Sequence, residues 1–188
     1  MSDKKTWMSR TIDGVEYCFD HLKTYRITVS RPARSPHAEM SFDLVVNFDC
    51  HVATEACGEP HEGPAYWRDS AGKCRVFDKR RYELSQALPS IIQAMVDGKD
   101  YCYEAKKNNY MVWKPAESNL ADPPYLFFFD LYLSPEEKGV LVLYVQSAYE
   151  KDEPWRMQRE NRKVFLRVCS ELLGLMPKKT KGPRSKSR

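Results

Sequence analysis

Glycine is scarce in this chain of 188 residues, which contains only eight. Loops that wrap a phosphate with backbone amides depend on glycine, and neither G-x-x-x-x-G-K-[ST] nor G-x-G-x-x-G occurs. The metalloprotease motif H-E-x-x-H and the hydrolase motif G-x-S-x-G are also missing. These absences argue against nucleotide hydrolases and dinucleotide-dependent enzymes.

Long apolar runs are lacking as well. The stretches at 126–129 and 140–145 are far shorter than the roughly 20 residues of a membrane-spanning helix. Residues 1–10 are polar and lack the apolar segment of a secretory signal. We therefore expect a cytoplasmic protein without membrane contact, whose six cysteines are reduced thiols.

Composition and charge indicate one folded domain with a basic tail. Apolar residues make up 42% of the chain, enough to form a core. The net charge is +4, but the last twelve residues hold six of the 30 bases and no acid, which leaves 24 bases against 26 acids, about −2, elsewhere. We expect a flexible N-terminus at 1–14, a single domain at 15–176 and a disordered basic tail at 177–188.

The periodicity of apolar residues predicts the element order. Alternation indicates strands around Tyr25–Val29 and at 42–48, followed by a long polar loop at 50–73. Asp78 suits the N-cap of a helical segment that Pro89 divides and Gly98 ends. Further strands are expected at 74–77, 101–105, 110–113, 125–133 and 140–148, and a helix at 155–176. This order predicts an α+β fold: a single domain with an antiparallel sheet of five or six strands, a helical pair and a C-terminal amphipathic helix.

The polar loop contains residues that can bind zinc. Cys50, His51, Cys57, His61 and Cys74 offer soft ligands, and the loop is long enough to surround an ion. However, no C-x2-C pair is present, so a polar loop with incidental cysteines is the alternative. Both interpretations remain open at this point.

A polar cluster ends the strand at 140–148. Simple alternation would place Val145, Ser147 and Tyr149 on one face, and Tyr144 and Gln146 on the other. A rigid strand end that carries hydroxyl, amide and phenol groups can bind a phosphate or a base, or can simply emerge into solvent.

Three further patterns could bind nucleic acid. In the predicted last helix the spacing of Arg156, Arg159, Lys163 and Arg167 forms a basic stripe, which is either a solvated face or a groove for RNA. Strand aromatics can stack bases or fill the core; these are Tyr101, Tyr103, Tyr110 and Trp113. Asp130 interrupts the apolar run YLFFFDLYL and is expected to be paired.

The element order over 42–176 resembles that of the RelE/barnase-like ribonuclease toxins of bacteria. The segments FDCH, RYELSQALP, NNYMVW and VQSAY also look like a family of hypothetical bacterial proteins. The toxin resemblance implies RNA cleavage without a metal or other cofactor, and it matches Tyr149, Arg156 and Lys163 to that group's scattered catalytic residues.

From these patterns we derive two functional hypotheses. The first is an RNA-binding protein, with or without metal-independent ribonuclease activity, that acts as a toxin-like or mobile-element-associated factor with an antitoxin-like protein partner. In it Tyr149 or Glu150 exchanges protons, and Arg156 and Lys163 stabilise the transition state. The residues expected to bind RNA are Gln146, Ser147, Arg159, Arg167, Lys178, Lys179 and Lys181. The second hypothesis is a non-catalytic protein-interaction or regulatory module whose 50–74 loop is pinned by zinc.

Overall fold

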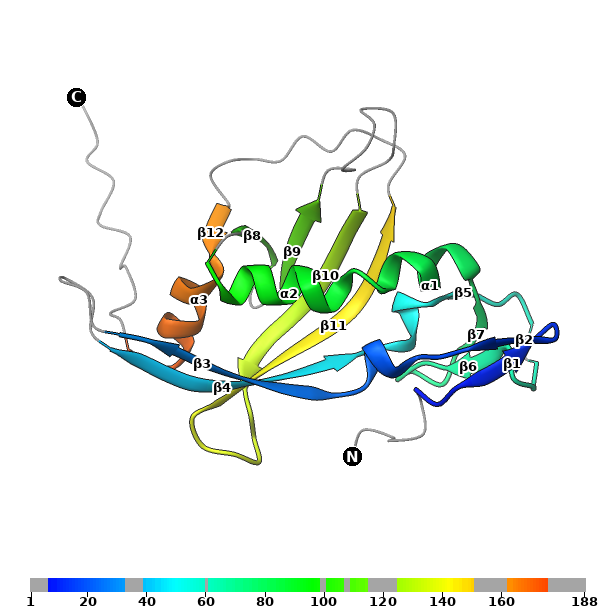
Figure 1. Ribbon diagram of the computed structural model, residues 1–188, viewed down its shortest axis with the longest axis horizontal. Helices are drawn as coiled ribbons and strands as arrows, with labels where there is room; N and C mark the ends of the chain where they lie inside the picture. The colour runs from blue at the N-terminus through cyan, green and yellow to red at the C-terminus, as the bar shows by residue number, and fades with distance from the viewer. Residues whose placement is uncertain are drawn as a thin grey trace, which may run out of the picture.

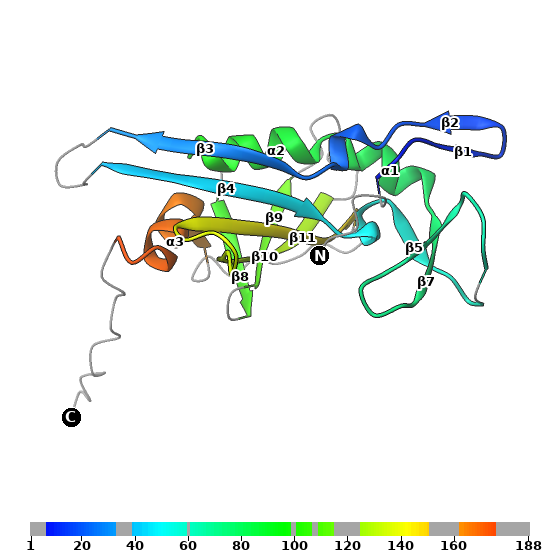
Figure 2. The ribbon, with the colours of Figure 1, turned by 90° about the horizontal axis from the view of Figure 1, so that it is seen from below.

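The computed structural model describes residues 7–32, 39–59, 61–98, 101–106, 109–114, 125–150 and 162–175 (Figure 1). Its main element is a seven-stranded sheet in the order β12-β8-β9-β10-β11-β4-β3. A three-stranded sheet, β5-β7-β6, and a hairpin of β1 and β2 lie at one end of the molecule, and helix α3 lies at the other (Figures 1 and 2).

The elements have the following bounds. The strands are β1 (Arg10–Ile12), β2 (Val15–Tyr17), β3 (Tyr25–Arg31), β4 (Met40–Phe48), β5 (Thr54–Ala56), β6 (Tyr66–Arg68), β7 (Cys74–Phe77), β8 (Tyr101–Lys106), β9 (Asn109–Lys114), β10 (Tyr125–Leu133), β11 (Val140–Glu150) and β12 (Arg162–Val164). The helices are α1 (Lys79–Ser85), α2 (Leu88–Val96) and α3 (Phe165–Leu172), with short 3₁₀ helices η1 (Asp20–Leu22) and η2 (Cys50–Val52).

The α+β prediction is confirmed, but the sheet differs in detail from the expected antiparallel sheet of five or six strands. The predicted meander β8-β9-β10-β11 is present and antiparallel throughout. β11 then pairs with β4 in parallel, and β4 pairs with β3 antiparallel. β7 joins the small sheet instead of the large one, because β5 and β6 flank it.

The core lies between the large sheet and the helices, and α1 and α2 cross one face of the sheet (Figure 1). Alternate residues of β10, including Phe127 and Phe129, are buried on this face. The ring of Phe165 on α3 packs against Phe129 with centroids 6.1 Å apart. Ile92 and Met95 of α2 are fully buried in the same core. No helix in the described ranges is long and apolar enough to cross a membrane.

The helical pair begins and ends as local chemistry predicts. The Asp78 carboxylate accepts a hydrogen bond from the backbone N–H of Arg81 at 2.9 Å, as an N-cap should. Pro89 lies in the first turn of α2, where its missing N–H costs no hydrogen bond, so α2 begins at Leu88 and not after the proline. Gly98 ends this segment with φ +74°, a conformation that favours glycine.

A β-bulge interrupts the alternation of β11. Phe129 pairs with Val145, but the preceding Phe128 pairs with Ser147. Gln146 is therefore an extra residue with no counterpart on β10.

The bulge moves every later side chain of β11 to the other face. Val145 and then Ala148 are buried in the main core, although they are three residues apart. Glu150 shares that face, whereas Ser147 and Tyr149 lie on the opposite face. The expectation that Ser147 and Tyr149 share a face with Val145 is therefore wrong.

The chain near both termini also differs from expectation. Residues 7–14, expected to be loosely held, include strand β1, and Trp7 is buried against Phe19 with its indole N–H bonded to Phe48 O at 3.3 Å. The helix expected at 155–176 is described only from Phe165, because Arg162–Val164 instead pairs with β8. Residues 155–161 and the tail at 177–188 lie outside the described residues.

Truncation of a buried and of an exposed side chain of β10 should have different effects on stability. Phe129→Ala removes a fully buried ring between β10 and α3, so we expect a loss of about 3–5 kcal/mol in the free energy of unfolding, measured by urea denaturation. Leu133→Ala, in the same strand but 48% exposed, should cost less than about 1 kcal/mol. Equal losses in the two variants would contradict this packing.

Candidate functional site

The parallel strands β4 and β11 end side by side, and the chain turns immediately after β4. The backbone N–H of Asp49 donates to Val145 O at 2.8 Å, which extends the pairing one residue beyond Phe48. Helix η2 begins at the next residue. The polar side chains of this turn therefore lie beside β11.

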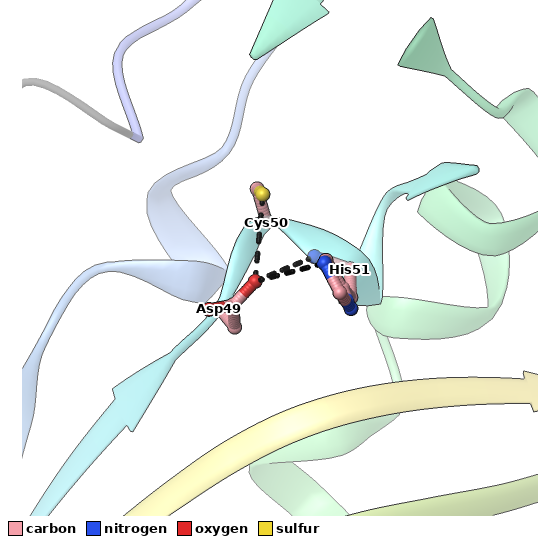
Figure 3. Close-up of side chains that lie close together, drawn as sticks. All are labelled: Asp49, Cys50 and His51. Carbon is pink, nitrogen blue, oxygen red and sulfur yellow. Dashed lines mark hydrogen bonds and ion pairs between the residues drawn. The ribbon is translucent and has the colours of Figure 1, made fainter. Parts of the chain in front are cut away.

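The buried carboxylate of Asp49 holds the turn together (Figure 3). One oxygen accepts from Cys50 Sγ at 3.4 Å and from the His51 backbone N–H at 3.2 Å. The other accepts a hydrogen bond from the hydroxyl of Tyr144 on β11. Burial, followed by the charge of Asp49, raises the pKa of Cys50 to about 12, so this thiol is protonated at neutral pH and is not an activated nucleophile.

The His51 imidazole extends this group toward the small sheet. His51 Nε2 lies 3.1 Å from Asp69 Oδ2, in the turn between β6 and β7. The other Asp69 oxygen accepts from the backbone N–H groups of Ala71 and Lys73, both at 2.9 Å. The His51–Asp69 contact therefore connects η2 to the turn between β6 and β7, which the Asp69 carboxylate itself stabilises.

The residues of the zinc hypothesis are not gathered at one point. Cys50 and His51 are engaged with Asp49 and Asp69, while Cys57, just after β5, faces Cys74 at the start of β7. The His61 ring packs on Tyr66 with centroids 5.2 Å apart. Within the described part of the chain, the side chains close enough to share an ion are Asp49, Cys50 and His51. Because their polar atoms already bond to one another, this set fits a hydrogen-bonded turn better than a four-ligand zinc centre.

A second polar group lies where α1 meets the end of β11. Arg80 Nη2 and Nε contact the two carboxylate oxygens of Glu150 at 2.5 and 3.0 Å, a bidentate pair. Arg81 Nη1 donates to the carbonyls of His51 and Thr54 at 3.1 and 3.0 Å. Arg80 is therefore paired with a half-buried carboxylate, and its neighbour Arg81 is bonded to the η2 turn and the start of β5.

Tyr125 adds a buried hydroxyl to this group. It pairs directly with Glu150 across the sheet, and its ring is 8% exposed. Its hydroxyl has no hydrogen-bond partner among the described residues. Burial raises the pKa of Tyr125 well above its usual value, and Arg81 and Glu150 are the charges that act on it. The hydroxyl is thus a protonated and buried donor close to Arg81 and Glu150. We call Arg80, Arg81, Tyr125 and Glu150 the Arg80–Glu150 group.

Tyr149 lies on the other face of β11. Its ring stacks on that of Phe128, with centroids 5.7 Å apart and planes at 20°. The guanidinium carbon of Arg81 lies 5.7 Å from the Tyr149 ring centroid. Because successive side chains alternate, Tyr149 and Glu150 lie on opposite faces of β11, and Arg81 lies near the Tyr149 ring.

Gln146 and Asp130 form part of a closed network on that second face. The amide of Gln146 donates to Asp130 Oδ2 at 2.5 Å, and the amide of Asn109 donates to Asp130 Oδ1 and to Gln146 Oε1, both at 2.9 Å. The expected pairing of Asp130 is confirmed, with amides as its partners. Gln146, predicted to bind RNA, is thus engaged within the protein, and Ser147 is partly buried next to it.

The structure does not bring the other predicted residues to this site. Lys163 is in β12, where its Nζ pairs with Glu104 at 2.6 Å, and three strands separate β12 from β11. Four strand spacings amount to about 19 Å. Arg167 pairs with Glu171 within α3 at 2.9 Å. The predicted single basic stripe is therefore wrong for Lys163 and Arg167, which belong to different elements. Arg156, Arg159, Lys178, Lys179 and Lys181 lie outside the described residues.

The strand aromatics are only partly described. Tyr101 is 42% exposed, and the guanidinium carbon of Arg162 lies 3.8 Å from its ring centroid. Tyr103 is half-buried. The side chains of Tyr110 and Trp113 lie outside the described part. A shared stacking surface for these four rings therefore stays a prediction.

Sequence reasoning missed Arg80, Arg81 and Tyr125. Arg80 and Arg81 follow the correctly predicted N-cap Asp78, so the helix start itself was the available signal. In the sequence, Tyr125 is one of several aromatic residues in a predicted strand. Its position opposite Glu150 depends on the bulge at Gln146, which the sequence does not show. No local pattern in the sequence marks that bulge.

The Tyr144–Asp49 hydrogen bond should be detectable in alkaline unfolding. Burial, then the hydrogen bond to the Asp49 carboxylate, raises the pKa of Tyr144 above its unfolded value near 10. The unfolded chain therefore loses this proton first, and the stability that it supplies is complete below pH 10 and declines as the pH rises above 10. Tyr144→Phe should lose about 1–3 kcal/mol at pH 7 and show a shallower decline between pH 10 and 12. Tyr101→Phe, which removes an exposed phenol, is the control; a wild-type decline in Tyr144→Phe would contradict the interpretation.

Comparison with known proteins places this architecture in a family. No curated protein and no solved structure matches the chain. The model of the YjaZ family matches residues 9–173, which include all the described strands and helices, the Asp49 turn and the Arg80–Glu150 group. The chain therefore belongs to the YjaZ family.

Proposed function

We propose that this protein binds RNA and cleaves it without a metal, using the Arg80–Glu150 group. One observation carries the proposal: a bidentate arginine–carboxylate pair stands beside a second arginine and a buried tyrosine hydroxyl that has no hydrogen-bond partner among the described residues. RNA is cleaved when a ribose 2′-hydroxyl attacks the adjacent phosphorus and the 5′-oxygen leaves. This reaction needs a base and cationic stabilisation of the phosphate, and the Arg80–Glu150 group contains both.

Each member has a role in that reaction. The Glu150 carboxylate takes the proton of the 2′-hydroxyl, which then attacks the phosphorus. Arg80 exchanges its pairing with Glu150 for the non-bridging phosphate oxygens, since guanidinium binds carboxylate and phosphate with the same geometry. The Tyr125 hydroxyl donates a hydrogen bond to a phosphate oxygen, and the leaving 5′-oxygen takes a proton from water. Arg80 and Arg81 thus replace Arg156 and Lys163 in the role first assigned to those residues.

The opposite face of β11 offers a surface for a base. The stacked rings of Tyr149 and Phe128 lie beside Arg81, and stacking on aromatic rings is a common mode of binding unpaired bases. An RNA strand that passes the end of β11 would meet aromatic groups on one side and the Arg80–Glu150 group on the other. The biological role proposed with this chemistry is a toxin-like or mobile-element-associated factor in the cytoplasm, controlled by an antitoxin-like protein.

Cleavage should depend on Glu150 but not on a matched carboxylate elsewhere. We expect Glu150→Gln to lower the rate of cleavage of an unstructured, fluorescent RNA in EDTA at least 100-fold, because the base is lost. Glu137→Gln is the control, since both carboxylate oxygens of Glu137 accept from Arg26 Nη2, at 2.6 and 2.8 Å, and Glu137 precedes β11 whereas Glu150 ends it. Arg81→Ala should weaken RNA binding as well as cleavage.

Three outcomes would contradict the proposal. If the wild-type protein does not cleave RNA, the catalytic role of Glu150 is wrong; if it binds RNA without cleavage, or only a protein, the non-catalytic module is favoured. Equal cleavage by wild type and Glu150→Gln would move the chemistry to another site. Circular dichroism spectra and melting curves of Glu150→Gln and Glu137→Gln show whether a loss of cleavage comes from the missing base or from unfolding.

The lysines of the tail should add affinity that depends on salt. Replacement of Lys178, Lys179 and Lys181 by glutamine removes three charges, so the log–log salt slope for single-stranded RNA should fall by about 2 in magnitude. Replacement of the exposed Lys23 and Lys138 is the control and should leave the slope nearly unchanged. Equal slopes in all three proteins would show that the tail does not bind RNA.

A further inference from the structure

Cys57 and Cys74 face each other across two strands of the small sheet. The register of β5 and β7 pairs Ala56 with Arg75, and one further step places Cys57 opposite Cys74. The backbone confirms that step, because Cys57 N donates to Cys74 O at 3.3 Å. Residues at a hydrogen-bonded antiparallel pair have Cα atoms about 5.5 Å apart, which lies within the range that a disulfide spans.

The two thiols also lie close together. The Cys74 thiol is within hydrogen-bonding reach of the Cys57 thiol and, after desolvation, is the next largest cause that raises the pKa of Cys57. Both side chains are partly exposed, and each sulfur contacts a loop carbonyl: Cys57 Sγ lies 2.6 Å from Glu59 O, and Cys74 Sγ lies 3.9 Å from His61 O. A small oxidant can therefore reach the pair.

The other four cysteines do not compete for this pairing. Cys50, Cys102 and Cys169 are buried, and burial raises the pKa of each thiol. Cys18 is exposed, in the segment between β2 and η1. Cys57 and Cys74 are thus two accessible thiols that a backbone ladder already holds in register.

We propose that Cys57 and Cys74 form a reversible disulfide by exchange with a low-molecular-weight disulfide such as glutathione disulfide. One of the two thiols loses its proton, and its thiolate attacks a sulfur of glutathione disulfide; that S–S bond breaks, and one glutathione leaves. The second thiol then loses its proton and attacks the mixed disulfide, which releases the second glutathione. The protein gives up two electrons and two protons, and glutathione disulfide becomes two glutathione thiols.

The bond would change how firmly one segment is held. It would close the chain from 57 to 74 into a covalent loop that contains β6 and Asp69, the residue whose carboxylate contacts His51. Oxidation would therefore stabilise the small sheet and its attachment to η2. This inference is independent of the proposed RNA chemistry.

The test uses full-length protein in which Cys18→Ser removes the other exposed thiol. After incubation with excess glutathione disulfide, this protein should lose two free thiols, retain no glutathione, and yield a Cys57–Cys74 cross-linked peptide by mass spectrometry. The additional variants Cys57→Ser and Cys74→Ser should each retain one glutathione instead. The oxidised protein should melt roughly 5–10 °C higher than the reduced protein, and dithiothreitol should reverse the shift.

Three results would overturn the proposal. These are stable glutathione adducts on both cysteines of the parent protein, consumption of Cys50 at the same rate as Cys57, and the absence of any cross-linked peptide in native protein. The peptide map is made on the parent protein, so it decides the question even if a serine variant fails to fold. Faster exchange at pH 9 than at pH 7 is expected in addition, since the thiolate is the attacking species.

Discussion

The parallel pairing of β4 with β11 is the constraint on which the rest of the molecule depends. These strands end at residues 48 and 150, and parallel neighbours cannot be joined by a tight turn. Everything between them must therefore fit into one long connection. The connection contains the small sheet, α1, α2 and the strands β8 to β10. The same pairing places Asp49 beside Val145, and through it joins the turn after β4 to Tyr144.

The local parts of the fold were predictable because their causes are local. Asp78 caps α1, Gly98 ends the helical segment, and the alternation in β3 and β4 reflects strands with one face against the core. Long-range features were not predictable in this way. β12 is extended because β8 accepts it as a neighbour, and nothing within Arg162–Val164 reveals that neighbour.

In the candidate site, too, the local features could be predicted from the sequence and the long-range ones could not. Glu150 and Tyr149 were found because a polar strand end is visible in the sequence. Their separation onto two faces was not found, since one inserted residue, Gln146, reverses the alternation and appears only when the register with β10 is known. Arg80 reaches Glu150 through the packing of α1 on β11, a contact between segments about seventy residues apart. Charge pairs at such separations require the tertiary structure.

The two edges of the large sheet have a consequence for how the molecule behaves in a crowded solution. An edge strand exposes unpaired backbone groups that can recruit another chain and begin aggregation. β12 is only three residues long, which offers little to extend. β3, the other edge, is seven residues long and carries Arg26, whose guanidinium is shared between Asp43 and Glu137. A second sheet that approached this edge would have to desolvate that charge cluster, so the same ion pairs that anchor β3 also keep separate copies of the chain from joining strand to strand.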